Sequence, residues 1–160
     1  MLIYTHAFDR QHTLYRLLLL FGHIETPLTL EQIRIFDFML SFPGYLTKVR
    51  KTKNVKIRTR MNKYDFSGSY QQCFFLMEQT QLSSLLELVS KKFILKNKSL
   101  FIKNNEYLST YDAVKSIDVI QEQKIALDII LGMFSEINVL GKDGLKARTH
   151  LMESVYDPKY

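Results

Sequence analysis

The chain contains a single cysteine, Cys73, among its 160 residues. One cysteine excludes an internal disulfide and a metal site built from several cysteines, and it fits a reducing cytoplasm. Long apolar runs are also missing, because the longest, residues 17–21, is far shorter than a membrane-spanning helix. The first residues do not lead from a basic segment into an apolar one, as secretory signals do. We therefore expect a cytoplasmic protein without a membrane segment.

Catalytic motifs are missing as well. The glycine-rich loop ending in Lys-Ser/Thr that binds nucleotide phosphates is absent, so we do not expect nucleotide hydrolysis by this chain alone. His6, His12, His23 and His150 are scattered without metal-ligand spacing, which favours surface or capping roles. Cys73 lies in a Gln-Gln-Cys-Phe-Phe run and fits a small buried hydrophobe better than a nucleophile. We expect no enzyme activity, no cofactor and no metal.

The composition supports a globular core, with 46% hydrophobic and 12% aromatic residues. The length suits a single domain over residues 1–160. We divide it into N-terminal helices with a basic segment (1–66), a winged-helix-like part (67–103) and a C-terminal helical part (104–160). The predicted fold class is α+β and mostly helical, with a winged helix-turn-helix-like unit, a small β-hairpin and a long C-terminal helix.

Two N-terminal helices are predicted from apolar spacing and capping residues. Apolar residues three and four apart indicate a first helix over residues 11–21, with Gly22 as its terminator. Thr29 and Gln32 form a T-x-x-Q capping box at the start of a second helix. This helix is apolar almost all round up to Pro43, so we expect it to be sandwiched between neighbouring elements.

The middle of the chain predicts two helices and a hairpin. A short helix over 70–77 would turn Tyr70, Phe74 and Met77 inward, and a second over 81–91 would begin at a Thr80 cap. Apolar residues at helical spacing predict the side that the second helix buries: Leu82, Leu85, Leu86 and Val89. Strands 93–95 and 100–102 follow, joined by a polar turn. Helix, helix and hairpin is the order of a winged helix-turn-helix.

The last third predicts a loop and one long helix. Residues 104–111 show no clear period and are expected to be irregular. A broad apolar stripe then predicts a helix over 116–138, and a short helical turn after Gly144.

The second helix of the winged-helix-like part has a polar but hardly basic outer face. Its expected exposed residues are Ser83, Ser84, Glu87, Ser90 and Lys91. Proteins that read bases bring Arg, Asn or Gln to the base edges, and only Gln81 at the helix start qualifies. A structural winged helix is therefore favoured over a base reader.

One segment concentrates the positive charge. The chain has a net charge of +6, and residues 48–63 contain eight basic residues and no acid, so the rest sums to −2. Residues 55–61 alternate apolar or Thr with basic side chains, as in a strand with one basic face. Three interpretations stay open: a solvated loop, a contact to phosphates, or docking to an acidic protein. The candidate DNA-binding residues are Lys48, Arg50, Lys51, Lys53, Lys56, Arg58, Arg60 and Lys63.

Arg34 and Asp37 interrupt the apolar second helix. They are three residues apart and are expected to form an intrahelical pair at the edge of the core. A polar contact to a partner subunit is the alternative.

Three stretches resemble the middle components of bacterial ABC-three-component (ABC-3C) systems. Residues 8–20 (FDRQHTLYRLLLL) are similar to the family's opening FD-x-x-H and its leucine-rich helix. Residues 30–43 (LEQIRIFDFMLSFP) resemble its D-x-L-R-I-L-D-F-x-L-x-x-P helix. Residues 75–86 (FLMEQTQLSSLL) are similar to M-x-x-x-Q-x-x-A-L, with Ser84 at the position usually filled by Ala. Their order and spacing carry the resemblance, which covers about two-thirds of the chain.

The resemblance implies a subunit of a system that defends bacteria against phages or plasmids. Such a subunit, as in the Lamassu-type LmuC class, would partner an SMC-like ABC ATPase, expected to be a dimer, and an effector such as a nuclease. Arg34, Asp37 and Phe38 would belong to the partner interface, and residues 48–63 would hold DNA without sequence specificity. The alternative is a free-standing winged-helix transcription regulator that binds duplex DNA by itself.

Overall fold

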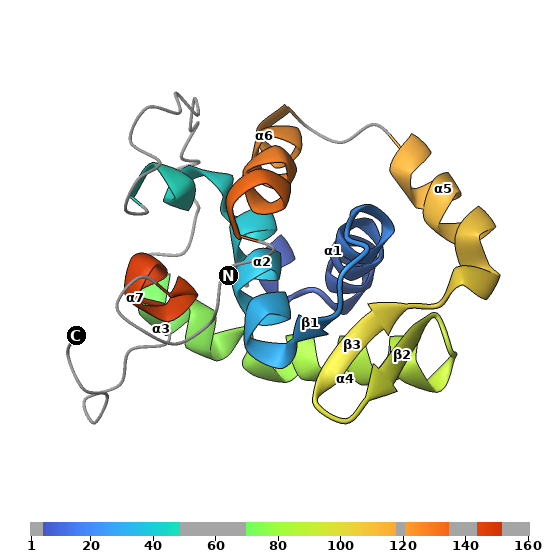
Figure 1. Cartoon of the computed structure of the whole chain (residues 1–160). Helices are drawn as coiled ribbons and strands as arrows, with labels where there is room; N and C mark the ends of the chain where they lie inside the picture. The colour runs from blue at the N-terminus through green and yellow to red at the C-terminus, as the bar shows by residue number, and fades with distance from the viewer. Residues whose placement is uncertain (1–4, 49–69, 118–120, 135–143, 152–160) are drawn as a thin grey trace.

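The computed structural model describes residues 5–48, 70–117, 121–134 and 144–151 (Figure 1). The described chain is mostly helical with one small antiparallel sheet, which confirms the α+β class. The longer helices are α1 (Arg10–His23), α2 (Leu30–Ser41), α3 (Tyr70–Leu76), α4 (Glu78–Ser90), α5 (Leu108–Ser116), α6 (Gln121–Ile129) and α7 (Leu145–Thr149). The 3-10 turns η1 (His6–Phe8), η2 (Pro43–Lys48) and η3 (Asn105–Tyr107) and the π-helical η4 (Ile130–Phe134) complete the helical elements.

The predicted N-terminal helices are present. Helix α1 is longer than expected because the Asp9 side chain caps it, accepting a hydrogen bond from the His12 amide at 2.9 Å. Gly22 lies inside its last turn and does not end it. Thr29 and Gln32 form both bonds of the predicted capping box on α2. Residues 32–41 of α2 are all buried, and α2 packs against α1, α4 and α6, so the sandwiched helix is confirmed.

The sheet contains one strand more than the sequence predicted. The expected hairpin is formed by β2 (Ile94–Asn97) and β3 (Leu100–Lys103), with Lys98 at a φ of 55° in the turn. The additional strand, β1 (Leu28–Thr29), pairs with β3, so the strand order is β1-β3-β2. Two residues are too few to show an alternating pattern, so sequence could not reveal β1.

Helix α4 begins earlier than predicted and buries only part of the expected stripe. Phe74 and Met77 are buried on α3 and at its end, as expected. Thr80 is not a cap: Met77 keeps helical dihedrals, and α3 continues into α4 without a fresh start. The buried residues of α4 are Gln81, Ser84, Leu85 and Leu88, whereas Leu86 of the predicted stripe is 58% exposed. Leu85 of the predicted stripe is buried and Val89 packs against the core, while Gln81 is buried because it bonds with Arg34 and Asp37 of α2.

The C-terminal third differs from the prediction in two places. Residues 104–111 are not irregular, because Asn104 caps η3 and α5 follows. Helix α5 packs on α1, and the buried Tyr111 donates a 2.6 Å hydrogen bond to the Phe93 carbonyl. The predicted helix over 116–138 does not begin at Ser116: α5 ends there, Ile117 is extended (φ −70°, ψ 135°), and α6 begins at Gln121. The short helix after Gly144 is confirmed as α7.

The core is one cluster to which most elements contribute. Leucines of α1, most of α2, Phe74 of α3, Tyr111 of α5 and Ala126 of α6 are among its buried members. Beside it, the Tyr45 hydroxyl of η2 donates to the Thr149 carbonyl at the end of α7. Within the described residues, no helix is long and apolar enough to cross a membrane.

Candidate functional site

The predicted DNA-binding segment falls almost entirely outside the described residues. Lys48 is the last residue of η2, which packs against α2 and α6. The remaining candidates, which lie beyond the described part of the chain, are Arg50, Lys51, Lys53, Lys56, Arg58, Arg60 and Lys63. Their contact with DNA therefore stays a prediction.

Asp37 binds an arginine of another helix. Its side chain is fully buried, and its two carboxylate oxygens accept from Arg16 Nε at 2.7 Å and Arg16 Nη2 at 3.3 Å. Arg16 is 2% exposed and donates further to Thr13 Oγ1 at 2.9 Å and to the His6 carbonyl at 3.2 Å. This forked pair fastens α1 to α2 in the core, where both charges are compensated.

Arg34 takes different partners from those predicted. Its Nε donates to Gln81 Oε1 at 3.1 Å, and its Nη2 lies 3.5 Å from the Phe74 carbonyl and 3.6 Å from Glu78 Oε2. The guanidinium stands 4.6 Å from the Phe74 ring centroid. Burial is the main influence on Arg34 and lowers its pKa, against which the nearby Glu78 acts. The expected Arg34–Asp37 pair is wrong: Asp37 pairs with Arg16, while Arg34 bonds Gln81 and pairs with Glu78.

Gln81 joins the two arginine systems. Its Nε2 donates to Asp37 Oδ2 at 2.9 Å and to the Arg34 carbonyl at 3.1 Å, while its Oε1 accepts from Arg34. We call Arg16, Arg34, Asp37 and Gln81 the buried network; it connects α1, α2 and α4. Sequence reasoning missed Arg16 and Gln81 as its members. The sequence did contain one signal for the buried network. Each of the three stretches that resemble the ABC-3C middle components contains at least one of its residues.

The proposed partner-interface residues lie inside the domain. Asp37 and Phe38 are fully buried and Arg34 is 8% exposed. The Phe38 ring packs edge-on against Tyr45, Tyr70 and Phe74. All three residues therefore have structural roles in this chain, and a direct contact with a partner stays a prediction.

Ser84 is a buried hydroxyl without a hydrogen-bond partner among the described residues. Its side chain is fully buried on α4, beside the apolar residue Leu85. A buried hydroxyl without a partner is destabilising, because it has lost its hydrogen bonds to water. The alanine that the family pattern usually has at this position would avoid that loss.

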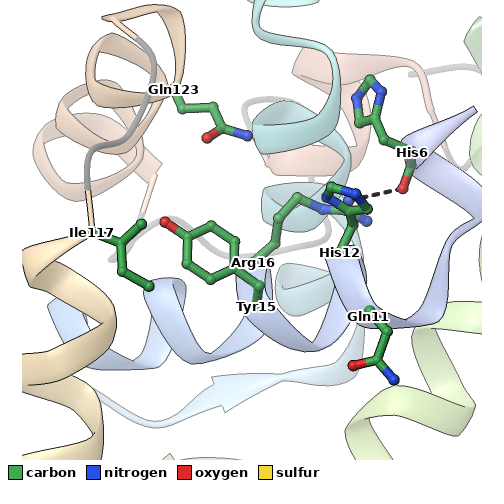
Figure 2. A pocket seen from close by; sticks show the side chains of 7 residues that line it. All are labelled: His6, Gln11, His12, Tyr15, Arg16, Ile117 and Gln123. Atoms are coloured by element: carbon green, nitrogen blue, oxygen red, sulfur yellow. Dashed lines mark hydrogen bonds between the residues drawn. The ribbon is translucent and has the colours of Figure 1, made fainter.

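A cavity of about 570 Å³ opens beside α1 (Figure 2). Its lining is His6, Gln11, His12, Tyr15, Arg16, Ile117 and Gln123. Several of these polar groups already bind within the domain: His6 Nε2 lies 3.0 Å from the Ser41 carbonyl, and Gln123 Nε2 donates to the Leu40 carbonyl at 3.2 Å. These two hydrogen bonds hold η1 and α6 against the end of α2. Partial burial raises the pKa of the Tyr15 hydroxyl.

The described residues contain no group of three or more His, Cys, Asp or Glu side chains placed to hold a metal ion. Cys73 is buried, and desolvation raises the pKa of its thiol to about 11, so the thiol is protonated near neutral pH. This placement agrees with its predicted role as a small buried hydrophobe.

The hairpin forms a second basic surface that sequence reasoning missed. Residues 88–105 contain no acid and carry five lysines. Lys103 is buried against Glu25 and Lys91 pairs with Glu87, while Lys92, Lys96 and Lys98 are exposed. Basic residues are less frequent in residues 88–105 than in residues 48–63, so the sequence alone did not indicate a basic surface here.

Comparison with known proteins identifies one family. The family model of Middle Component 5 of ABC-three component (ABC-3C) systems matches residues 2–157. No curated protein and no solved structure matches the chain. The matched range covers nearly the whole sequence, including the final third in which no family motif was found. The chain therefore belongs to the ABC-3C system Middle Component 5 family.

Proposed function

We propose that this chain is a non-catalytic accessory subunit of a bacterial defence complex against phages or plasmids. It would connect an SMC-like ABC ATPase to an effector, a nuclease in the Lamassu-type arrangement. The family match over residues 2–157 carries the proposal, because a middle component implies an ATPase and an effector as partners. The buried network supports a scaffolding role, since its charged groups are used to hold helices together.

A winged-helix arrangement is part of the proposal. Helix α1, strand β1, helix α2, the α3–α4 pair and the β2–β3 hairpin follow one another in the order of that fold, and β1 pairs with β3. The hairpin is the wing. We propose that this unit is a structural scaffold, because α4 contains no lysine or arginine that could reach DNA bases or phosphates.

The complex would bind DNA through residues 48–63 without reading its sequence. Eight cations and no acid make this segment suited to neutralising phosphates. The exposed lysines of the hairpin add a second cationic surface on the same chain. Non-specific backbone contacts of this kind depend steeply on salt.

The test uses the complex reconstituted from this chain and the ATPase and effector subunits of its ABC-3C system. Arg50, Lys51, Lys56, Arg58 and Arg60 are replaced together by Glu, and DNA affinity is measured by fluorescence anisotropy at several salt concentrations. Each lost phosphate contact should lower the slope of log K against log salt by about 0.9. The control replaces Lys115 and Lys124, which are exposed on α5 and α6, by Glu.

Assembly should survive the five substitutions while DNA binding weakens. Unchanged DNA affinity and salt slope would rule out the proposed DNA contact. The competing function, a free-standing regulator, requires the isolated chain to bind one duplex far more tightly than a scrambled one near physiological salt. The absence of lysine and arginine from α4 argues against that outcome.

A further inference from the structure

Helices α3 and α4 form one continuous helical surface. Met77 between them has helical dihedrals (φ −71°, ψ −17°). Its backbone N–H donates to the Cys73 carbonyl at 3.0 Å, and the backbone N–H of Gln81 donates to the Met77 carbonyl at 2.9 Å. The i to i−4 hydrogen bonds of an α-helix therefore run through the junction. The two helices follow one another along one side of the molecule (Figure 1).

Large apolar side chains stand on the solvent side of this surface. Phe75 is 71% exposed, Leu76 is 50% exposed and Leu86 is 58% exposed. Phe75, Leu82 and Leu86 are separated by seven and four residues, which places them on one side of the helix. We call this side the neutral face; it consists of Gln72, Phe75, Gln79, Leu82, Leu86 and Ser90.

None of the exposed residues between Tyr70 and Ser90 is charged. The charged residues of this stretch, Glu78 and Glu87, are only partly exposed and lie at the borders of the neutral face. Glu78 pairs with Arg34, and Glu87 pairs with Arg10 and Lys91. Helices that face only water usually carry charged residues on that side, and clustered exposed apolar groups mark a contact surface.

We propose that the neutral face is a docking surface for another protein subunit of the same ABC-3C system. This inference rests on the proposed function, which supplies the partners. The subunit would present an apolar helix or groove without charges at its centre, together with amide or hydroxyl groups for Gln79 and Ser90. Phe75 and Leu86 would be the anchors that fill apolar hollows on it.

The absence of charge selects this class of partner. A nucleic acid needs cations to replace its counterions, and an anionic membrane surface attracts helices with lysine or arginine flanks. A charged protein surface placed here would lose its water without gaining a counter-charge. An uncharged apolar surface with amide or hydroxyl groups placed for Gln79 and Ser90 loses least on contact with this face.

The test again uses the full chain with the ATPase and effector subunits of its ABC-3C system. The variant carries Phe75→Ser and Leu86→Ser, and its binding to each subunit is measured by biolayer interferometry. The matched control carries Leu95→Ser and Leu100→Ser on the hairpin, where the wild-type leucines are 44% and 40% exposed. Thermal unfolding of both variants checks that they fold.

The neutral-face variant should bind one of the two subunits about tenfold or more weakly, while the hairpin control binds as the wild type does. Equal binding of wild type and neutral-face variant would overturn the inference and leave the proposed function standing. A wild-type chain that binds neither subunit would overturn the proposed function itself.

Two additions keep the test decisive. If the double serine variant does not fold, Gln79→Arg places a charge at the centre of the neutral face on an exposed residue. Its binding should fall in the same way, and unchanged binding would overturn the inference. Light scattering on the isolated chain reports self-association: a dimer that Phe75→Ser and Leu86→Ser dissolve would assign the face to a second copy and overturn the inference.

Discussion

The Nε atom of Arg16 lies 2.7 Å from Oδ1 of Asp37, and both side chains are almost completely removed from water. The two residues are 21 positions apart and fasten α1 to α2. Since Gln81 of α4 donates to the other oxygen of Asp37, one carboxylate connects three helices. The stability of the domain should therefore depend on this carboxylate more than on any surface ion pair.

Replacing Asp37 by Ala should lower the free energy of unfolding by about 3–5 kcal/mol, because it leaves the buried Arg16 without a counter-charge. Urea unfolding followed by circular dichroism measures the change. The combined variant Arg16→Met and Asp37→Leu removes both charges and should lose much less. A loss below about 1 kcal/mol for Asp37→Ala, at the level of exposed pairs, would show that the pair contributes little.

Replacing Ser84 by Ala should raise the free energy of unfolding by about 1 kcal/mol, because it removes a buried hydroxyl without a partner. The same urea titration measures it. Ser83→Ala is the matched control, since Ser83 is only partly buried and its hydroxyl already donates to the Thr80 carbonyl. Destabilisation by Ser84→Ala would mean that the hydroxyl has a partner in solution.

Replacing Lys92 by Gly should stabilise the protein by about 1 kcal/mol. Lys92 has a φ of 62° just after α4, where its amide donates to the Val89 carbonyl and the Phe93 amide donates to the Leu88 carbonyl. This is a Schellman ending, in which glycine is the usual residue. Lys96→Gly, within strand β2, is the control and should destabilise instead. The urea concentration at the midpoint of unfolding measures the change. A lower midpoint for Lys92→Gly than for the wild type would contradict the argument.

Stability should fall above about pH 9. Burial raises the pKa of Cys73 from 9.0 to about 11 and that of Tyr111 from 10.0 to about 12. The folded state therefore holds these protons more tightly than the unfolded state, so their contribution is complete below pH 9 and is lost as the pH rises toward 12. Urea midpoints from pH 7 to 11 measure the decline, which Cys73→Ala should make smaller.

Thiol chemistry offers a second readout of the same burial. At pH 8 the folded protein should react with a disulfide reagent much more slowly than the urea-unfolded protein, because the thiol is buried and protonated. Equal rates in the two states would show that Cys73 is accessible in the folded chain.

Local signals in the sequence predicted local structure well. Thr29 and Gln32 form the capping box because both partners lie within one turn of each other. Helix α2 is buried on nearly every side, as its apolar residues indicated, and the β2–β3 hairpin follows from two apolar runs around a polar turn. In each case the residues that determine the element are neighbours in the chain.

Several predictions that depended on distant partners failed, as did two local ones, the Gly22 terminator and the Thr80 cap. Arg34 and Asp37 are close in sequence, but each finds a better partner on another helix. The apolar period after Ser116 continues smoothly, yet α5, which packs against α1, ends there. No local pattern reports such contacts.

The sequence alone determined the helical character of this protein, the capping box of α2, its hairpin and the placement of its charge, since all of these depend on residues a few positions apart. The tertiary structure decided which side of α4 is buried and which arginine neutralises Asp37. Those outcomes depend on geometry between helices, where a buried charge binds whichever partner offers the best-oriented hydrogen bonds.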